Sequence, residues 1–179
     1  MGCQIVDKPG FTVIGQTRQF TTIDGANFKL IPLWWNEFVN SPDYEELTSL
    51  SGKHPGKVTG GEILGIDFGA PDSTEFSYGI GVEIPKPISS ELYVNMEIAP
   101  ATWAIFNCTL DKMQATYKYI FEEWFLSSGY KHDAVPHIEV YLAAKPSEKM
   151  NCELWIPIRK KVVDISWSPV LPVVLPSLG

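Results

Sequence analysis

The expected secondary-structure elements occur in the same order twice along this chain, and this repeat constrains the fold more than any single motif. Apolar periodicity and turn residues predict strand, helix, strand and strand over about residues 11–84, and again over about residues 100–161. A unit repeated at this scale indicates two copies that bury a shared core. The sequence therefore predicts an α+β domain built from two pseudo-symmetric βαββ repeats.

The first repeat combines clear strand patterns with a less regular helical region. A helix is expected over residues 32–40, because a proline suits the first helical turn and Trp34 and Phe38 are spaced four residues apart. A second short helix follows through Leu47, and the Gly/Ser/Pro-rich residues 49–61 are expected to form a loop. We expect strands over 61–69 and 75–84 after an initial strand over 11–20, and the last strand places on one face Phe76, Tyr78, Ile80 and Val82.

The second repeat has the more regular helix. A strand over 101–108 leads to a capping-box spacing of Asp111 and Gln114, and Gly129 is a plausible C-cap. The residues between them place on one helical face Met113, Tyr117, Ile120 and Trp124. Two strands over 137–143 and 152–160 are expected to flank a turn at Lys145–Glu148, and Trp155 would be roughly equivalent to Tyr78 of the first repeat.

Composition and charge exclude several classes of protein. The net charge of −7 argues against a nucleic-acid-binding surface, which needs clustered Lys and Arg. No apolar run approaches a membrane span, and the N-terminus lacks an apolar signal core. Cys3, Cys108 and Cys152 have no zinc-site spacing, so we expect neither a metal nor a cofactor. A reducing cytoplasm fits these cysteines best.

The segment HIEVY contains one acid, Glu139, on an otherwise apolar strand, where an unpaired charge is costly. Alternation places Glu139 on the same face as His137 and Tyr141, and directs the aliphatic face toward the helices. In the next strand Glu153 and Trp155 share a face. Glu139 either points at water or takes a partner inside the fold. In the second case, aromatic rings around it would form a cage for an organic cation.

Seven segments in order resemble the GyrI-like small-molecule-binding domain, which is also the effector-binding domain of AraC-type and MerR-type regulators. They are FTVIGQT, IPLWWNEF, FSYGIGVE, IAPATWAIFNC, YKYIFEEWFLSSGY, HIEVY and ELWIPIRK, and together they cover about residues 11–161. The resemblance implies a cupped, mainly antiparallel sheet, two main helices on one side, and a ligand cleft between the repeats. Residues 1–161 would form this single domain, followed by a proline-rich extension over 162–179. No DNA-binding helix-turn-helix precedes Phe11, so a regulatory role would need a partner chain.

The resemblance also implies which residues bind the ligand. Glu139 matches the family's deep acid, Trp124 its helix tryptophan, and Trp155 its Trp-Ile-Pro position. Because Trp34 and Trp35 are adjacent in a helix, only one of them can face the cleft. The ligand-binding residues expected from these arguments are Glu139, Tyr141, Trp124, Trp155, Tyr78, Tyr117, Phe106 and Trp34.

Three functions are compatible with these features. The first is stand-alone binding of small amphipathic molecules that are cationic or polar aromatic, in a sensing, sequestering or regulatory role. The second is hydrolysis of cyclopropanoid DNA-alkylating compounds, with Glu139 as the catalytic base. The third is a gyrase-inhibitor-like interaction module, in which the extension would contact a protein partner or a second copy of the chain. The sequence favours the binding function.

Overall fold

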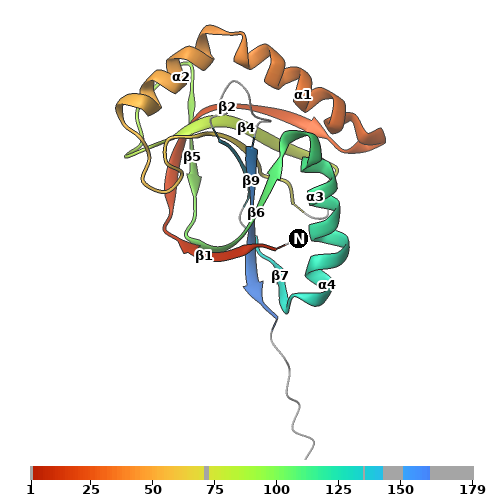
Figure 1. Cartoon of the computed structure of the whole chain (residues 1–179). Helices are drawn as coiled ribbons and strands as arrows, with labels where there is room; N and C mark the ends of the chain where they lie inside the picture. Colours follow the sequence, from red (N-terminus) through yellow and green to blue (C-terminus); the bar gives the residue numbers. More distant parts are fainter. Residues whose placement is uncertain (1, 71–72, 135, 143–150, 162–179) are drawn as a thin grey trace, which may run out of the picture.

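The computed structural model describes residues 2–70, 73–134, 136–142 and 151–161 (Figure 1). The expected turn at Lys145–Glu148 and the extension over 162–179 lie outside these residues. The strands are β1 (Gln4–Lys8), β2 (Phe11–Thr21), β3 (Ile63–Asp67), β4 (Glu75–Ile84), β5 (Val94–Ile98), β6 (Ala101–Thr109), β7 (Tyr130–His132), β8 (His137–Tyr141) and β9 (Asn151–Lys160). The helices are α1 (Ala26–Val39), α2 (Pro42–Lys53), α3 (Met113–Tyr119) and α4 (Phe125–Ser127), with short 3₁₀ turns at Ile23–Gly25 and Leu110–Lys112.

The described strands form a single nine-stranded sheet in the order β1-β6-β9-β8-β3-β4-β2-β5, with β7 paired to β9. Every strand pair is antiparallel, and the two halves meet where β3 pairs with β8. At the centre of this seam Gly65 lies opposite Glu139. The α+β class and the two related halves are therefore confirmed.

Each half begins with one strand more than the sequence predicts, and the halves exchange these strands. β1 precedes β2 in the chain but pairs with β6, whereas β5 precedes β6 but pairs with β2. Both strands are five residues long and border the sheet, where periodicity is weakest. β7, three residues long, was also not expected.

The helices begin and end at different residues from those predicted. α1 starts at Ala26, so Pro32 lies in its interior and leaves the carbonyl oxygen of Phe28 without its helical donor. α2 continues to Lys53, well past Leu47, and thus includes part of the segment expected to be a loop. Strong turn residues such as Gly52 do not end a helix when packing and a favourable N1 proline stabilise it.

The second helical region is divided by a π-helical turn over Ile120–Trp124, which joins α3 to α4. No side chain caps α3, so the expected capping box is wrong, and the Thr109 hydroxyl instead donates to Asp111 (2.5 Å). The wider turn changes the direction of the side chains after Tyr119. Gly129 has a φ of 72°, as a helix-terminating glycine requires.

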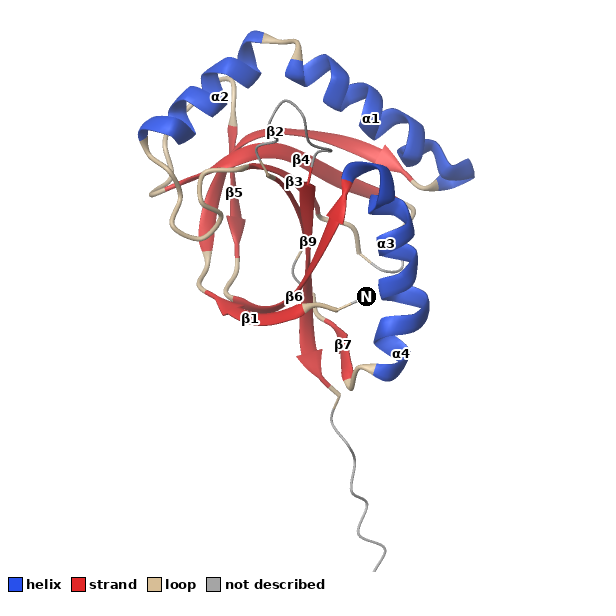
Figure 2. Ribbon diagram, viewed as in Figure 1, coloured by secondary structure: helices blue, strands red, loops and turns tan. Residues whose placement is uncertain are grey.

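The sheet curls, and the helices cover its outer face (Figure 2). α1 and α2 contact β2 and β4, while α3 contacts β6 and α4 contacts β7. The inner face carries a core to which strands of both halves contribute, including Val13, Leu64, Trp103, Ile138 and Val140. The aliphatic face of β8 therefore packs in this inner core, and the expectation that it packs on the helices is wrong.

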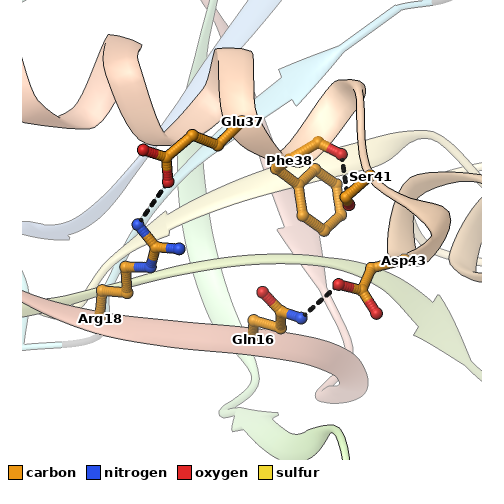
Figure 3. A network of polar contacts seen from close by, with 6 residues as sticks. All are labelled: Gln16, Arg18, Glu37, Phe38, Ser41 and Asp43. Atoms are coloured by element: carbon orange, nitrogen blue, oxygen red, sulfur yellow. Dashed lines mark hydrogen bonds and ion pairs between the residues drawn. The ribbon is translucent and has the colours of Figure 1, made fainter.

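Polar contacts join α1 and α2 to the neighbouring strand β2 (Figure 3). The Arg18 guanidinium pairs with Glu37 (2.9 Å), and the Gln16 side-chain amide donates to Asp43 (2.9 Å). Both partners of the ion pair are largely exposed, so it contributes at most about 1 kcal/mol. The apolar core beneath the helices, which includes Trp34 and Phe38, supplies the larger contribution.

Two strands of the first half approach closely at paired glycines, Gly15 and Gly81. A Cβ atom on Gly15 would collide with the backbone of Ile80 and lie 2.6 Å from the Cα of Gly81. We therefore expect Gly15→Ala to lower the free energy of unfolding by about 2 kcal/mol or more, measured by urea denaturation.

Gly52→Ala is the matched control, because Gly52 lies in α2 with open space around its Cα. This substitution should raise the free energy of unfolding by about 0.5–1 kcal/mol, since alanine loses less backbone entropy. Equal effects of the two substitutions would contradict the close approach of β2 and β4.

Candidate ligand-binding pocket

A cavity of about 820 Å³ lies on the outer face of the sheet, between α1 and α3. Its floor is formed by β3, β4 and β8, the strands on both sides of the seam, and Tyr44 of α2 also lines it. The volume is in the range of sites that enclose small organic ligands. The cleft between repeats that the resemblance implied is therefore present.

The Glu139 carboxylate lies at the floor of this cavity, and the residue is only 8% exposed. Its Oε2 accepts hydrogen bonds from the hydroxyls of Tyr78 (2.5 Å) and Tyr141 (2.6 Å), and its Oε1 accepts one from Tyr117 (3.2 Å). The indole N–H of Trp35 donates to the Tyr78 hydroxyl (3.1 Å). Four aromatic side chains from α1, α3, β4 and β8 thus orient one acid.

Gly65 leaves room for the side chains of Glu139 and Tyr78. It lies opposite Glu139 in the sheet, and a Cβ at this position would collide with the Tyr78 hydroxyl and lie 2.8 Å from Glu139 Oε2. Because glycine has no side chain, Tyr78 can reach across β3 to the carboxylate. The buried acid therefore depends on a glycine in the neighbouring strand as well as on its donors.

The three tyrosines remain hydrogen-bond donors over the physiological pH range. Burial raises the pKa values of Tyr78, Tyr117 and Tyr141 well above 10, and the nearby Glu139 carboxylate raises them further. All three hydroxyls therefore keep their protons and donate to the acid.

A second acid, Asp67, also lines the cavity. Its Oδ1 accepts the backbone N–H of Gly69 (2.7 Å). Burial raises the pKa of Asp67 from 3.8 to about 6, the Gly69 hydrogen bond partly opposes this increase, and the negative charge of Glu139 adds to it. Asp67 thus changes its charge close to neutral pH.

His137 contributes a neutral imidazole to the wall. Its Nε2 lies 2.7 Å from Nε2 of His132, so one ring donates to the other, and the ring of Phe121 packs beside it at 5.5 Å. Burial lowers the pKa of His137 to about 3, and the neighbouring His132 contributes to the decrease. Within the described ranges, no group of three or more His, Cys, Asp or Glu residues could hold a metal ion.

Apolar side chains surround the acid cluster and continue to the surface. Phe28, Val39, Leu110 and Phe121 line the cavity and are between 41% and 62% exposed. Exposed apolar side chains at the mouth of a cavity are typical of a surface that a ligand covers. Asn27 also lines the cavity, and its buried Oδ1 has no hydrogen-bond partner among the described residues.

The structure brings together four of the eight predicted ligand-binding residues in the cavity: Glu139, Tyr141, Tyr78 and Tyr117. Trp34 is not among the lining residues. It is 2% exposed and packs against Phe20 and Tyr78. Trp35, which lines the cavity, is the member of the pair that faces it.

Phe106, Trp124 and Trp155 do not line the cavity either. Trp155 pairs with Ile138, so it lies on the inner face of the sheet, with Lys8 over its ring. The expected equivalence with Tyr78 is wrong for the same reason, since Tyr78 points to the outer face. Phe106 is fully buried beneath the α3–α4 region, where it packs against Trp124.

The sequence contained weak signals for the residues that the prediction missed. Asp67 is the only acid in β3, and strand alternation places it on the same face as Gly65. In the same way, alternation in β8 places Glu139 on the same face as Tyr141. Phe121 follows Tyr117 by four residues on α3 and its π-helical continuation. Which of these residues share a space is decided by the pairing of β3 with β8, and a single sequence does not specify this pairing.

Asp67 provides a test of the pocket's electrostatics through protein stability. The folded state holds a proton between about pH 4 and pH 6 that the unfolded chain releases. The contribution of protonated Asp67 to the free energy of unfolding is therefore complete below about pH 4, and it is lost as the pH rises through about 6. Asp67→Asn keeps an acceptor for Gly69 but carries no charge. We expect it to be about 1–3 kcal/mol more stable than wild type at pH 8, and similar at pH 4, in urea unfolding.

Glu37→Gln is a suitable control, because Glu37 is an exposed acid on α1. It should change the free energy of unfolding little at either pH. An Asp67→Asn protein that is no more stable than wild type at pH 8 would contradict the burial of this carboxyl.

Comparisons with known proteins agree with this architecture. The sequence profile of Cass2, the integron-associated effector binding protein family, matches residues 4–158. The fold is similar to that of SAV2435, solved bound to tetraphenylphosphonium (TM-score 0.71, 19% identity, covering 89% of this chain and 94% of that one). A putative bacterial transcription regulation protein from Staphylococcus aureus MU50 is also similar (TM-score 0.66, 21% identity, 89% and 99% covered). So is an integron cassette protein from Vibrio cholerae (TM-score 0.57, 18% identity, 88% and 96% covered).

At these identities the solved structures show a shared fold, whereas the profile shows the family. A search of curated proteins found no match. In the part of the chain that the structure describes, no helix has both the length and the apolar character needed to cross a membrane. The chain belongs to the integron-associated effector binding protein family and has the GyrI-like effector-binding fold, and it is accordingly a small-molecule-binding protein.

Proposed function

We propose that this chain binds bulky, amphipathic organic cations in the pocket between α1 and α3, with the Glu139 carboxylate as the counter-charge. The observation that carries the proposal is the buried acid at the pocket floor, to which the described residues offer three hydroxyl donors but no ion pair. Hydroxyl donors orient a carboxylate without neutralising it. A cationic ligand supplies the missing charge in a low-dielectric space.

The rings around the acid suit the same class of ligand. Trp35 and Tyr141 lie with ring centroids 4.5 Å apart, and Tyr117 is stacked on Phe121. Each ring that a cation approaches contributes about 0.5–2 kcal/mol. The unpartnered Oδ1 of Asn27 can accept a hydrogen bond from a ligand N–H.

One structurally similar protein supports the choice of ligand class, since SAV2435 has been solved with tetraphenylphosphonium bound. This cation is bulky, aromatic and unable to donate hydrogen bonds. It therefore suits a pocket whose floor supplies charge and whose walls supply apolar surface. In this chain, binding would serve sensing, sequestration or regulation in the cytoplasm, together with a protein partner if transcription is the output.

The geometry supports binding over the hydrolytic alternative. A general base needs a carboxylate oxygen within hydrogen-bond reach of the water that it activates. Oε2 of Glu139 already accepts from two tyrosine hydroxyls and Oε1 from a third, so only Oε1 has capacity left to accept from a water. A cavity of about 820 Å³ with a buried acid likewise favours a small ligand over the flat contact of an inhibitor of gyrase.

The proposal is tested with two ions of the same shape and opposite charge, tetraphenylphosphonium and tetraphenylborate. We expect wild type to bind the cation more tightly than the anion. Glu139→Gln should weaken cation binding about 10- to 100-fold, because it removes the counter-charge but keeps acceptor capacity. Tryptophan fluorescence or calorimetric titration measures both affinities.

Glu37→Gln removes one negative charge from the outside of α1 and does not touch the pocket lining. It should bind both ions like wild type, which separates local pairing from the general effect of net charge. If Glu139→Gln bound tetraphenylphosphonium as tightly as wild type, Glu139 would not be the counter-charge.

A further inference from the structure

We propose that the pocket has two anionic anchors, Glu139 and Asp67, and that it selects organic dications over monocations of the same shape. This inference rests on the proposed function and extends it from one charge to two. Its basis is the placement of both carboxyls on one face of neighbouring strands, inside one cavity.

The pairing of β3 with β8 fixes the separation of the two acids. Gly65 lies opposite Glu139, and Asp67 is two residues further along β3, where it lies opposite His137. Side chains two residues apart in a strand point to the same face. Glu139 and Asp67 are therefore diagonal neighbours, a relationship that separates residues by roughly 7–8 Å. A rigid molecule with two positive centres at a similar distance can contact both carboxyls.

Asp67 has the capacity for such a contact. Only its Oδ1 has a described hydrogen bond, from the Gly69 amide, and its carboxyl forms no ion pair with any described residue. The neighbouring glycine positions keep side chains away, since a Cβ at Gly69 would lie 2.8 Å from Asp67 Oδ1. One oxygen thus holds the carboxyl in place while the other can meet a ligand.

No fixed positive charge among the described residues neutralises these acids at the floor. Opposite Asp67 lie Tyr78 on β4 and the neutral His137 on β8, and Tyr117 faces it from α3. The lining residues of α1 are all uncharged, and α2 contributes Tyr44. Lys118 on α3 and Glu122 on the π-helical turn are exposed lining residues, and Lys118 Nζ lies 3.9 Å from Glu122 Oε2. The floor therefore carries up to two negative charges and no described positive one.

The charge state of Asp67 gives the selectivity a defined pH dependence. The pKa of Asp67 is about 6, raised first by burial and further by Glu139. Above this pH Asp67 is charged and offers a second anionic partner, which a dication can use and a monocation leaves unpaired. Below it Asp67 is neutral and the second positive group loses its partner. The preference for the dication should therefore rise between pH 5 and pH 7.5, and dication binding near pH 6 should release protons.

The test compares two flat probes of nearly the same shape. Methyl viologen carries two ring nitrogens separated by a distance similar to that of diagonal strand neighbours, roughly 7 Å. N-methyl-4-phenylpyridinium carries one. The affinity ratio of dication to monocation should be about tenfold or more larger at pH 7.5 than at pH 5 in wild type. Asp67→Asn should remove this increase, and Glu37→Gln should keep it.

The outcomes separate this inference from the function on which it rests. If monocation binding depends on Glu139 but Asp67→Asn leaves the ratio at pH 7.5 unchanged, the second anchor is refuted and the cation pocket stands. If binding of neither probe depends on Glu139, the pocket function itself is refuted. Unfolding curves at both pH values verify that Asp67→Asn is folded. Calorimetry in two buffers of different ionisation enthalpy measures proton release, which must decrease in Asp67→Asn.

Discussion

The rest of the pocket depends on one buried carboxylate at the seam between two related halves. Glu139 lies at the centre of the pairing between β3 and β8, opposite a glycine that leaves room for its donors. Burying an acid is costly unless it has partners, and here the hydroxyls of three tyrosines donate to it. The fold thus holds a carboxylate without a described ion pair in an apolar cavity, and the proposed cation binding rests on this feature.

The two related halves make different contributions to this site. The second half supplies the acid and two of its donors, from β8 and α3, while the first half supplies Tyr78, Trp35 and the empty position at Gly65. The same strand position thus carries a glycine in one half and the acid in the other. A symmetric scaffold produces an asymmetric pocket because the two halves carry different residues at the positions that meet across the seam.

Local patterns predicted the local features of this structure. The alternation of HIEVY correctly placed Glu139 and Tyr141 on one face, and the i,i+4 spacing of α3 correctly grouped Tyr117 with the core-facing residues. Trp155 was misplaced, because its face depends on the pairing of β9 with β8. Asp67 was missed, since its proximity to Glu139 arises only when strands more than 70 residues apart in sequence become neighbours.

The exchanged strands β1 and β5 determine how the two halves hold together. The first strand of each half pairs with a strand of the other half: β1 pairs with β6, and β5 pairs with β2. A polypeptide cut between β4 and β5 therefore yields two fragments, each of which lacks one of its edge strands. In such fragments the backbone groups of β2 and β6 that pair with β5 and β1 in the intact chain would be exposed. The exchange therefore joins the two halves at both edges of the sheet as well as at the seam, and the cavity needs both halves because each supplies part of its lining.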